Sequence, residues 1–293
     1  MKIDLKAKSS SEILKWFENN PIKEGDTLEI ELSNTDIDRI GYKAFVDLAQ
    51  LFFMRMLTPY VKDDTVVLKF YRLHQESSFH KSGQSSEKYG TMSEFFKIDK
   101  TAQFGFLYYY RQALRFADIK EKKRILNLGI NKADEFFVIK EMLQEDEFKA
   151  KKFVGIDHSS SAIAYAKESF AHPNTEFICH DINKLDELEL GRFDLIISIG
   201  TLQSSSIEFK PVFMKLYQEY LEKGGSIILG FPNCRWIESE MIYGAKAPNY
   251  SFNEMSLVLK DIHFCKKYLQ QKKYRVIVTG KDYLFLTAKK IGI

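Results

Sequence analysis

Two aspartates that follow strand-like apolar runs have the chemistry to bind a nucleoside. Asp157 ends the run FVGID, where a carboxylate could accept hydrogen bonds from both hydroxyls of a ribose. It lies 28 residues after Gly129, about one strand–helix–strand unit. Asp181 follows the next run, placed to accept from an exocyclic amine, while Ile182 offers an apolar wall to an adenine ring. The structural alternatives are that Asp157 or Ser159 caps a helix and that Asp181 lies in a solvated loop.

Positioning these residues requires a sheet, and the chain from residue 120 onwards has the pattern of one. Short apolar runs alternate with amphipathic segments, which predicts an α/β fold with a doubly wound, mostly parallel sheet of seven strands. Three residues separate the last two strands, too few for a parallel crossover, so they form an antiparallel hairpin. The expected strands are 124–129, 153–157, 176–179, 193–199, 226–231, 274–279 and 283–289, with helices over 133–143, 162–170, 210–221 and 254–271.

Residues 1–75 predict a separate small α+β unit. A helix capped near Ser9 precedes a strand over 27–32. Apolar spacing then favours one helix over 37–56, ended by Pro59, and alternation favours a strand over 64–73. We expect this unit to mediate homodimer formation if the protein is a dimer.

Residues 76–118 connect the small unit to the sheet, which we expect to span 119–293. The first part is rich in Ser and Gly, as in a loop or linker, and a helix is expected over 94–118. His80 and Tyr89 lie within the loop and are candidate substrate-binding residues in a lid; a plain linker is the alternative.

Residues at the ends of the fourth and fifth strands are further candidates for substrate binding. Gln203 follows the fourth strand, and the long segment 231–251 follows the fifth. Within that segment, Arg235 and Lys246 could hold a carboxylate or phosphate, with Asn233 and Tyr243 as neighbours. A packed surface excursion is the alternative reading.

The motifs LNLGINKAD, VGIDHS, ICHDIN, FDLIIS and KGGSIILG, in this order, resemble the series of class I S-adenosylmethionine-dependent methyltransferases. The resemblance covers about residues 120 to 291. It implies S-adenosylmethionine as cofactor and S-adenosylhomocysteine as product; the few, distant cysteines favour a cytoplasmic compartment. The implied cofactor-binding residues are Asn127, Gly129, Asp157, His158, Asp181, Ile182, Ser198 and Ile199.

The first motif departs from the family pattern. Asn127 stands where an acidic residue is usual, and Ile130, Asn131 and Ala133 stand where smaller residues are usual. Asp134 or Glu135 is then the candidate to supply the missing charge. No catalytic residue is assigned, because methyl transfer chiefly requires alignment of the nucleophile with the methyl group.

Composition leaves the acceptor open. The formal net charge is +3, short of the strongly basic balance of a dedicated nucleic-acid binder. Three distant cysteines predict neither a disulfide framework nor a zinc site, and no metal is expected. The first residues lack the apolar core of a signal peptide, and no apolar run is long enough to span a membrane.

Three hypotheses follow for function. The leading one is methyl transfer to O or N of a small, anionic molecule. The second is modification of tRNA or rRNA, because the basic runs 120–124 and 266–273 could contact phosphates. The third is a non-catalytic protein that binds an S-adenosyl ligand or acts as a scaffold.

Overall fold

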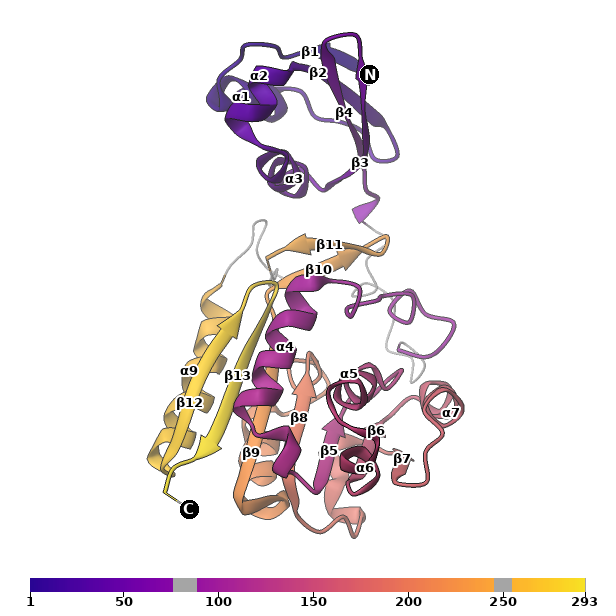
Figure 1. Ribbon diagram of the computed structural model, residues 1–293, viewed down its shortest axis with the longest axis vertical. Coiled ribbons are helices and arrows are strands. Elements are labelled where there is room, and N and C mark those ends of the chain that lie inside the picture. The colour runs from indigo at the N-terminus through magenta and orange to yellow at the C-terminus, as the bar shows by residue number, and fades with distance from the viewer. Residues whose placement is uncertain (76–88, 245–254, 293) are drawn as a thin grey trace. The chain divides into compact units, whose positions relative to one another are not determined.

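The computed structural model describes residues 1–75, 89–244 and 255–292 (Figure 1). The chain divides into two compact units. Unit 1 comprises Met1–Lys81 and Arg235–Tyr243, and unit 2 comprises Ser82–Cys234 and Gly244–Ile293. Within the described ranges, no helix is both long and apolar enough to cross a bilayer.

Unit 2 contains a seven-stranded sheet of order β12-β13-β9-β8-β5-β6-β7. Strands β5 to β9 pair in parallel, whereas β13 is antiparallel to both β9 and β12. The predicted doubly wound sheet and its closing hairpin are therefore confirmed. Its strands are β5 (Arg124–Leu128), β6 (Lys152–Asp157), β7 (Thr175–Cys179), β8 (Phe193–Ile199), β9 (Leu221–Pro232), β12 (Tyr274–Gly280) and β13 (Tyr283–Lys290).

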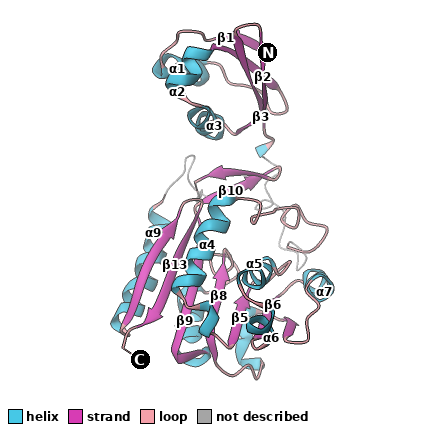
Figure 2. Cartoon of the chain, viewed as in Figure 1, coloured by secondary structure: helices cyan, strands magenta, loops and turns pink. Residues whose placement is uncertain are grey.

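Helices cover both faces of this sheet (Figures 1 and 2). On one face, Phe136 of α5 packs on Phe153, and Tyr110 of α4 stacks on Phe285. On the other face, α8 and α9 contribute Phe213 and Cys265 to the core. The helical segments of unit 2 are α4 (Phe104–Phe116), η3 (Ile119–Glu121), α5 (Asp134–Met142), α6 (Glu145–Lys149), α7 (Ser160–Ser169), η4 (Ile182–Glu187), α8 (Phe209–Lys215), η5 (Leu216–Tyr220) and α9 (Ser256–Gln271).

The strand order reverses at β5. From β5 the chain moves outward to β6 and β7, then returns to β8 on the other side of β5. In open α/β sheets, ligands bind at the carboxyl ends of the strands beside such a switch point. The ends of β5, β6 and β8 are therefore the place to look for a site.

Unit 1 is a four-stranded sheet of order β1-β2-β4-β3 packed against helices. Strand β1 pairs in parallel with β2, and the other pairs are antiparallel. Its elements are β1 (Lys2–Asp4), α1 (Ser10–Asn19), β2 (Thr27–Ser33), α2 (Asn34–Ile40), α3 (Tyr42–Leu51), β3 (Met54–Lys62) and β4 (Thr65–Arg72).

The single helix expected over 37–56 is wrong. Gly41, with φ of 83°, divides the segment into α2 and α3, and residues from Met54 onwards form strand β3. Pro59 does not end a helix but lies inside β3, where the ladder shifts register between Leu57 and Tyr60. Proline is tolerated there because β3 is an edge strand, which needs fewer backbone donors.

Three further expectations also need correction. The helix expected over 94–118 begins only at Phe104, after a stretch of turns. The helix over 210–221 widens into a π-helical turn at Leu216–Tyr220, and Leu221 already belongs to β9. The segment 231–251 contains a hairpin of β10 (Cys234–Ile237) and β11 (Glu240–Tyr243) that the sequence reading missed.

That hairpin belongs to unit 1, from Arg235 onwards. Gln50 of α3 donates through Nε2 to the carbonyl of Met241 at 3.1 Å. The Arg235 guanidinium lies 4.6 Å from the Phe53 ring centroid, and Ile237 packs in a small apolar cluster with Leu73. Unit 1 is thus built from two separate stretches of the chain.

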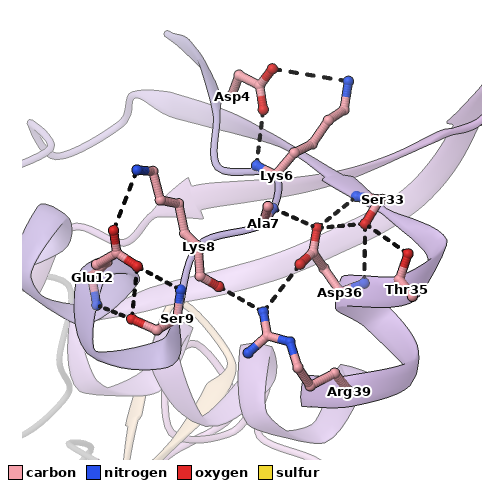
Figure 3. A network of polar contacts seen from close by, with 10 residues as sticks. All are labelled: Asp4, Lys6, Ala7, Lys8, Ser9, Glu12, Ser33, Thr35, Asp36 and Arg39. Atoms are coloured by element: carbon pink, nitrogen blue, oxygen red, sulfur yellow. Dashed lines mark hydrogen bonds and ion pairs between the residues drawn. The ribbon is translucent and has the colours of Figure 1, made fainter.

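A buried carboxylate, Asp36, joins the start of α2 to the loop before α1 (Figure 3). Asp36 Oδ2 accepts hydrogen bonds from Ala7 N at 3.1 Å and from Ser33 N and Oγ at 3.0 and 2.6 Å. Arg39 Nη2 lies 3.1 Å from Oδ1. Burial acts to raise the pKa of Asp36, but these donors outweigh it and leave the pKa below its ordinary value.

We expect Asp36→Asn to lower the unfolding free energy of unit 1 by about 2 kcal/mol at neutral pH, because hydrogen bonds to a charged group are lost. Both tryptophans, Trp16 and Trp236, lie in unit 1, so tryptophan fluorescence in urea reports on this unit. Because the folded pKa is lowered, the stabilisation is complete above about pH 4 and is lost as the pH falls further.

The exposed Asp38→Asn is the matched control and should unfold like the unchanged protein. A deficit in Asp36→Asn that stays the same from pH 7 down to the acid range would contradict the role assigned to this carboxylate.

Candidate cofactor site

Asp157, the last residue of β6, lies at the carboxyl edge of the unit 2 sheet. Its side chain is buried, and it accepts from two backbone amides: Asn131 N on Oδ2 at 3.0 Å and Ser159 N on Oδ1 at 3.1 Å. Burial raises the pKa of Asp157, while both amides act to lower it. An ionised carboxylate has about four acceptor positions. Two hydroxyl groups of a ligand could therefore still bind to Asp157.

Gly129 follows β5 at the switch point, and its backbone requires glycine. Its φ is 76°, and its amide donates to the carbonyl of Ile156 at 2.8 Å. A Cβ atom at this position would lie 1.9 Å from Thr201 Oγ1, in the loop after β8. The loops after β5 and β8 therefore meet at Gly129, which admits no side chain.

The rest of the loop after β5 keeps a glycine-like backbone without glycines. Asn131 has φ of 42° and Ala133 has φ of 65°, both in the left-handed region. Each such L-residue costs about 1–2 kcal/mol relative to right-handed backbone. The strain is accepted because this conformation places the Asn131 amide on Asp157 and starts α5 immediately after Ala133.

The segment 89–100 covers this loop and is fastened to it. Asn131 Nδ2 donates to the carbonyl of Tyr89 at 2.8 Å, and Lys132 Nζ donates to the carbonyl of Ile98 at 2.7 Å. The Tyr89 ring packs edge-on against His158, with 5.5 Å between ring centroids. We call residues 89–100 the cover segment.

A buried ion pair ties the end of the cover segment to α5. Lys100 Nζ lies 2.6 Å from Glu135 Oε1, and the Glu135 side chain is 1% exposed. Burial raises the pKa of Glu135, against the opposing effect of the Lys100 charge. Burial acts to lower the pKa of Lys100, but the surrounding carboxylates raise it. Glu135 Oε2 is buried and has no hydrogen-bond partner within the described residues.

Asn127 is a second buried polar side chain with unused hydrogen-bonding groups. It is fully buried in β5, and neither Oδ1 nor Nδ2 has a partner in the described part of the chain. It shares a sheet face with Gly155 and Ile197, its register neighbours on β6 and β8. An unsatisfied buried amide costs about 1–3 kcal/mol, so a polar ligand group at this position would be stabilising.

The other residues expected to bind cofactor lie at the same edge. His158 is exposed, with Nδ1 3.5 Å from Asp157 Oδ1. Asp181 caps η4 by accepting from Asn183 N at 2.9 Å, and Ile182 packs in the core beneath it. Ser198 is buried and donates to the Leu128 carbonyl at 3.4 Å, and Ile199 is buried beside it.

The residues expected to bind substrate fall into three groups: some lie outside the described residues, some in unit 2 and some in unit 1. His80 and Lys246 lie outside the described residues. Asn233 is buried at the end of β9 and donates through Nδ2 to the Lys281 carbonyl at 3.2 Å. Gln203, in the loop after β8, has a buried Oε1 without a partner among the described residues. By contrast, Arg235 and Tyr243 belong to the hairpin of unit 1.

Sequence reasoning missed Lys100, Lys132 and Thr201. Lys100 lies 35 residues before its partner Glu135, in a stretch without helical or strand periodicity. Thr201 is a small polar residue in a loop, and nothing in the sequence indicates that it touches Gly129. Within the described ranges, no group of three or more His, Cys, Asp or Glu side chains is arranged to hold a metal ion.

Comparison with known proteins identifies the family to which this chain belongs. A family model described as "Methyltransferase domain" matches residues 119–280, more than half of the chain. The search of curated proteins returned no match.

Among solved structures, the chain is similar to the N-methyltransferase NodS from Bradyrhizobium japonicum, in complex with S-adenosylhomocysteine, at 14% identity over 71% of this chain and 98% of that one, with a TM-score of 0.47. It is also similar to precorrin-6y C5,15-methyltransferase from Geobacter metallireducens, at 10% identity over 66% and 94%, with a TM-score of 0.45. A third is a ribosomal protein L11 methylase from Lactobacillus delbrueckii, at 12% identity over 63% and 78%, with a TM-score of 0.41.

Proposed function

This chain belongs to the methyltransferase-domain family of S-adenosylmethionine-dependent enzymes, and we propose that it methylates a small-molecule acceptor at the carboxyl edge of its sheet. In the reaction, the acceptor's O or N atom bonds to the methyl carbon as the carbon–sulfur bond breaks. The electron pair stays on sulfur, giving S-adenosylhomocysteine, and a proton carried by the acceptor atom is released to solvent. The cofactor supplies an electrophilic methyl group, and the protein supplies alignment.

The residues at this edge fit the cofactor. Asp157 has acceptor positions left for two ribose hydroxyls. At the other end of the ligand, Glu135 Oε2 and the Asn127 amide are buried groups that lack partners among the described residues. An ammonium group could donate to either acceptor, and a carboxylate group could approach Lys100 Nζ. Glu135 would then supply the negative charge that Asn127 lacks.

The observation that favours a small acceptor is the cover segment. It is fastened to the loop after β5 through Tyr89 and Ile98, and to the start of α5 through Lys100. Thr91 N also donates to Ser161 Oγ at 3.1 Å, at the start of α7. A segment held at four points across this edge leaves less room for a polynucleotide than for a metabolite. The anionic character expected of the acceptor rests on Arg235 and Lys246, and stays a prediction.

The acceptor class is tested with cofactor labelled in the methyl group. The protein is incubated with a small-molecule extract and, separately, with total RNA, and transfer is measured by scintillation counting. We expect label in the small-molecule fraction, and none when Asp157→Ala replaces the unchanged protein. Label in RNA alone would overturn the small-acceptor proposal, and label in neither would leave it unsupported and count against it.

A further inference from the structure

A basic groove lies at the opposite edge of the unit 2 sheet, away from the candidate cofactor site. It has a volume of about 440 Å³ and is formed where α4 ends, β12 begins and β13 ends. In Figure 1 this is the region beside the end marked C. Its lining includes Arg115, Phe116, Asp118, Arg275, Lys289 and Lys290.

The groove contains cationic side chains that have no ion-pair partner among the described residues. Lys289 is paired with Asp118, the one carboxylate in the lining, and Lys290 Nζ donates to the Lys272 carbonyl at 2.6 Å. Arg115 and Arg275 are exposed, and neither has an ion pair with any described carboxylate. Arg115 lies in the last turn of α4, where one cation suffices to offset the helix dipole. The second guanidinium, that of Arg275, lies on strand β12 and has no helix dipole to offset.

Arg275 is nevertheless held in place. Its guanidinium carbon lies 5.5 Å from the centroid of the Phe116 ring, within cation–π distance. The N–H groups of a guanidinium lie in its plane, so packing of the group on a ring face leaves them available to a ligand. Fixed guanidinium groups beside flexible ammonium groups are the usual recognition set for phosphate.

Of the two basic runs of the sequence, the end of 266–273 reaches this groove, where the Lys272 carbonyl accepts from Lys290 Nζ in the turn between α9 and β12. In the run 120–124, Lys120 pairs instead with Glu147. The Lys272 ammonium lies 5.8 Å from the Tyr268 ring centroid, beside the strand that carries Arg275. The positive charge around the groove therefore comes from four separate elements rather than from one solvated helix face.

We propose that this groove is a second ligand site, which binds phosphate groups of either a soluble polyphosphate or RNA. It is independent of methyl transfer, because it lies at the amino ends of the parallel strands, whereas Asp157 and Gly129 lie at their carboxyl ends.

The test uses the full chain with saturating S-adenosylhomocysteine, so that the cofactor site is occupied. The two probes are inorganic tripolyphosphate, followed by calorimetry, and a fluorescein-labelled oligouridylate of about twelve nucleotides, followed by anisotropy. We expect at least one probe to bind, and Arg115→Gln/Arg275→Gln to weaken it about tenfold or more. The control Lys167→Gln/Lys260→Gln removes two exposed charges elsewhere in unit 2 and should stay within about twofold.

Preference for tripolyphosphate would identify a soluble ligand, and preference for the oligonucleotide, with a steep salt dependence, would identify RNA. Binding of neither probe would overturn the proposal, as would an equal loss in the control variant. Because cofactor affinity is measured separately on the same variants and should be unchanged, failure here is distinguishable from failure of the proposed function.

Discussion

Asp157→Ala is expected to weaken S-adenosylhomocysteine binding by about a hundredfold or more, measured by calorimetry. Hydrogen bonds from hydroxyls to a charged acceptor contribute about 1.5–3 kcal/mol each, and two of them correspond to at least that change in Kd. The substitution also frees the amides of Asn131 and Ser159, which now donate to this carboxylate. Loss of ribose contacts and loosening of the loop therefore act in the same direction.

Asp157→Asn is a milder variant for comparison. It preserves shape and one acceptor oxygen but turns an NH2 group towards one of the two backbone amides, so we expect a loss of about tenfold, with a circular dichroism spectrum unchanged. An affinity of Asp157→Ala within about threefold of the unchanged protein would refute the ribose assignment.

Lys100→Met is expected to lower the unfolding free energy of unit 2 by about 3–5 kcal/mol, because it leaves the Glu135 carboxylate buried and unpaired. The measurement is urea unfolding followed by far-ultraviolet circular dichroism. The double variant Lys100→Met/Glu135→Met removes both charges and should recover most of the loss.

The pH dependence of Lys100→Met gives a second readout. Burial already raises the pKa of Glu135, and removing the Lys100 charge raises it further. A group whose folded pKa is raised stabilises the fold in its protonated form, and this benefit is lost as the pH rises. The deficit of Lys100→Met should therefore be larger at pH 8 than at pH 5. A deficit that grows on acidification would contradict the buried ion pair.

Much of unit 2 could be predicted from the sequence because its strands are buried on both faces. Continuous apolar runs such as LIISI in β8 and IILG in β9 mark such strands, and the short link between β12 and β13 dictates a hairpin. The polar residue directly after such a run, Asp157, then falls at the ligand edge.

Unit 1 was harder to predict because its pattern is ambiguous locally. Apolar residues at helical spacing continue from α3 into β3, and pairing with the partner strand β4 decides where helix gives way to strand. The β10–β11 hairpin consists of two four-residue strands that take their stability from contacts with residues such as Gln50 and Phe53. Contacts between residues so far apart in the chain produce no periodic pattern in the sequence.

The candidate site likewise combines residues that the sequence predicts with contacts that only the structure reveals. Gly129 and Asp157 could be identified because each follows an apolar strand. The Lys100–Glu135 pair and the contact of Thr201 with Gly129 depend on which loops meet in three dimensions. Asn127 could be recognised as a departure from the family pattern, but its lack of a hydrogen-bond partner among the described residues required the structure.

The most direct test of the cofactor assignment is a crystal structure of the protein with S-adenosylhomocysteine. We expect density for the ligand at the carboxyl ends of β5 and β6, with the ribose hydroxyls on Asp157 and the amino acid end near Glu135 and Lys100. Density for the ligand away from Asp157, or a site empty at saturating ligand, would contradict it.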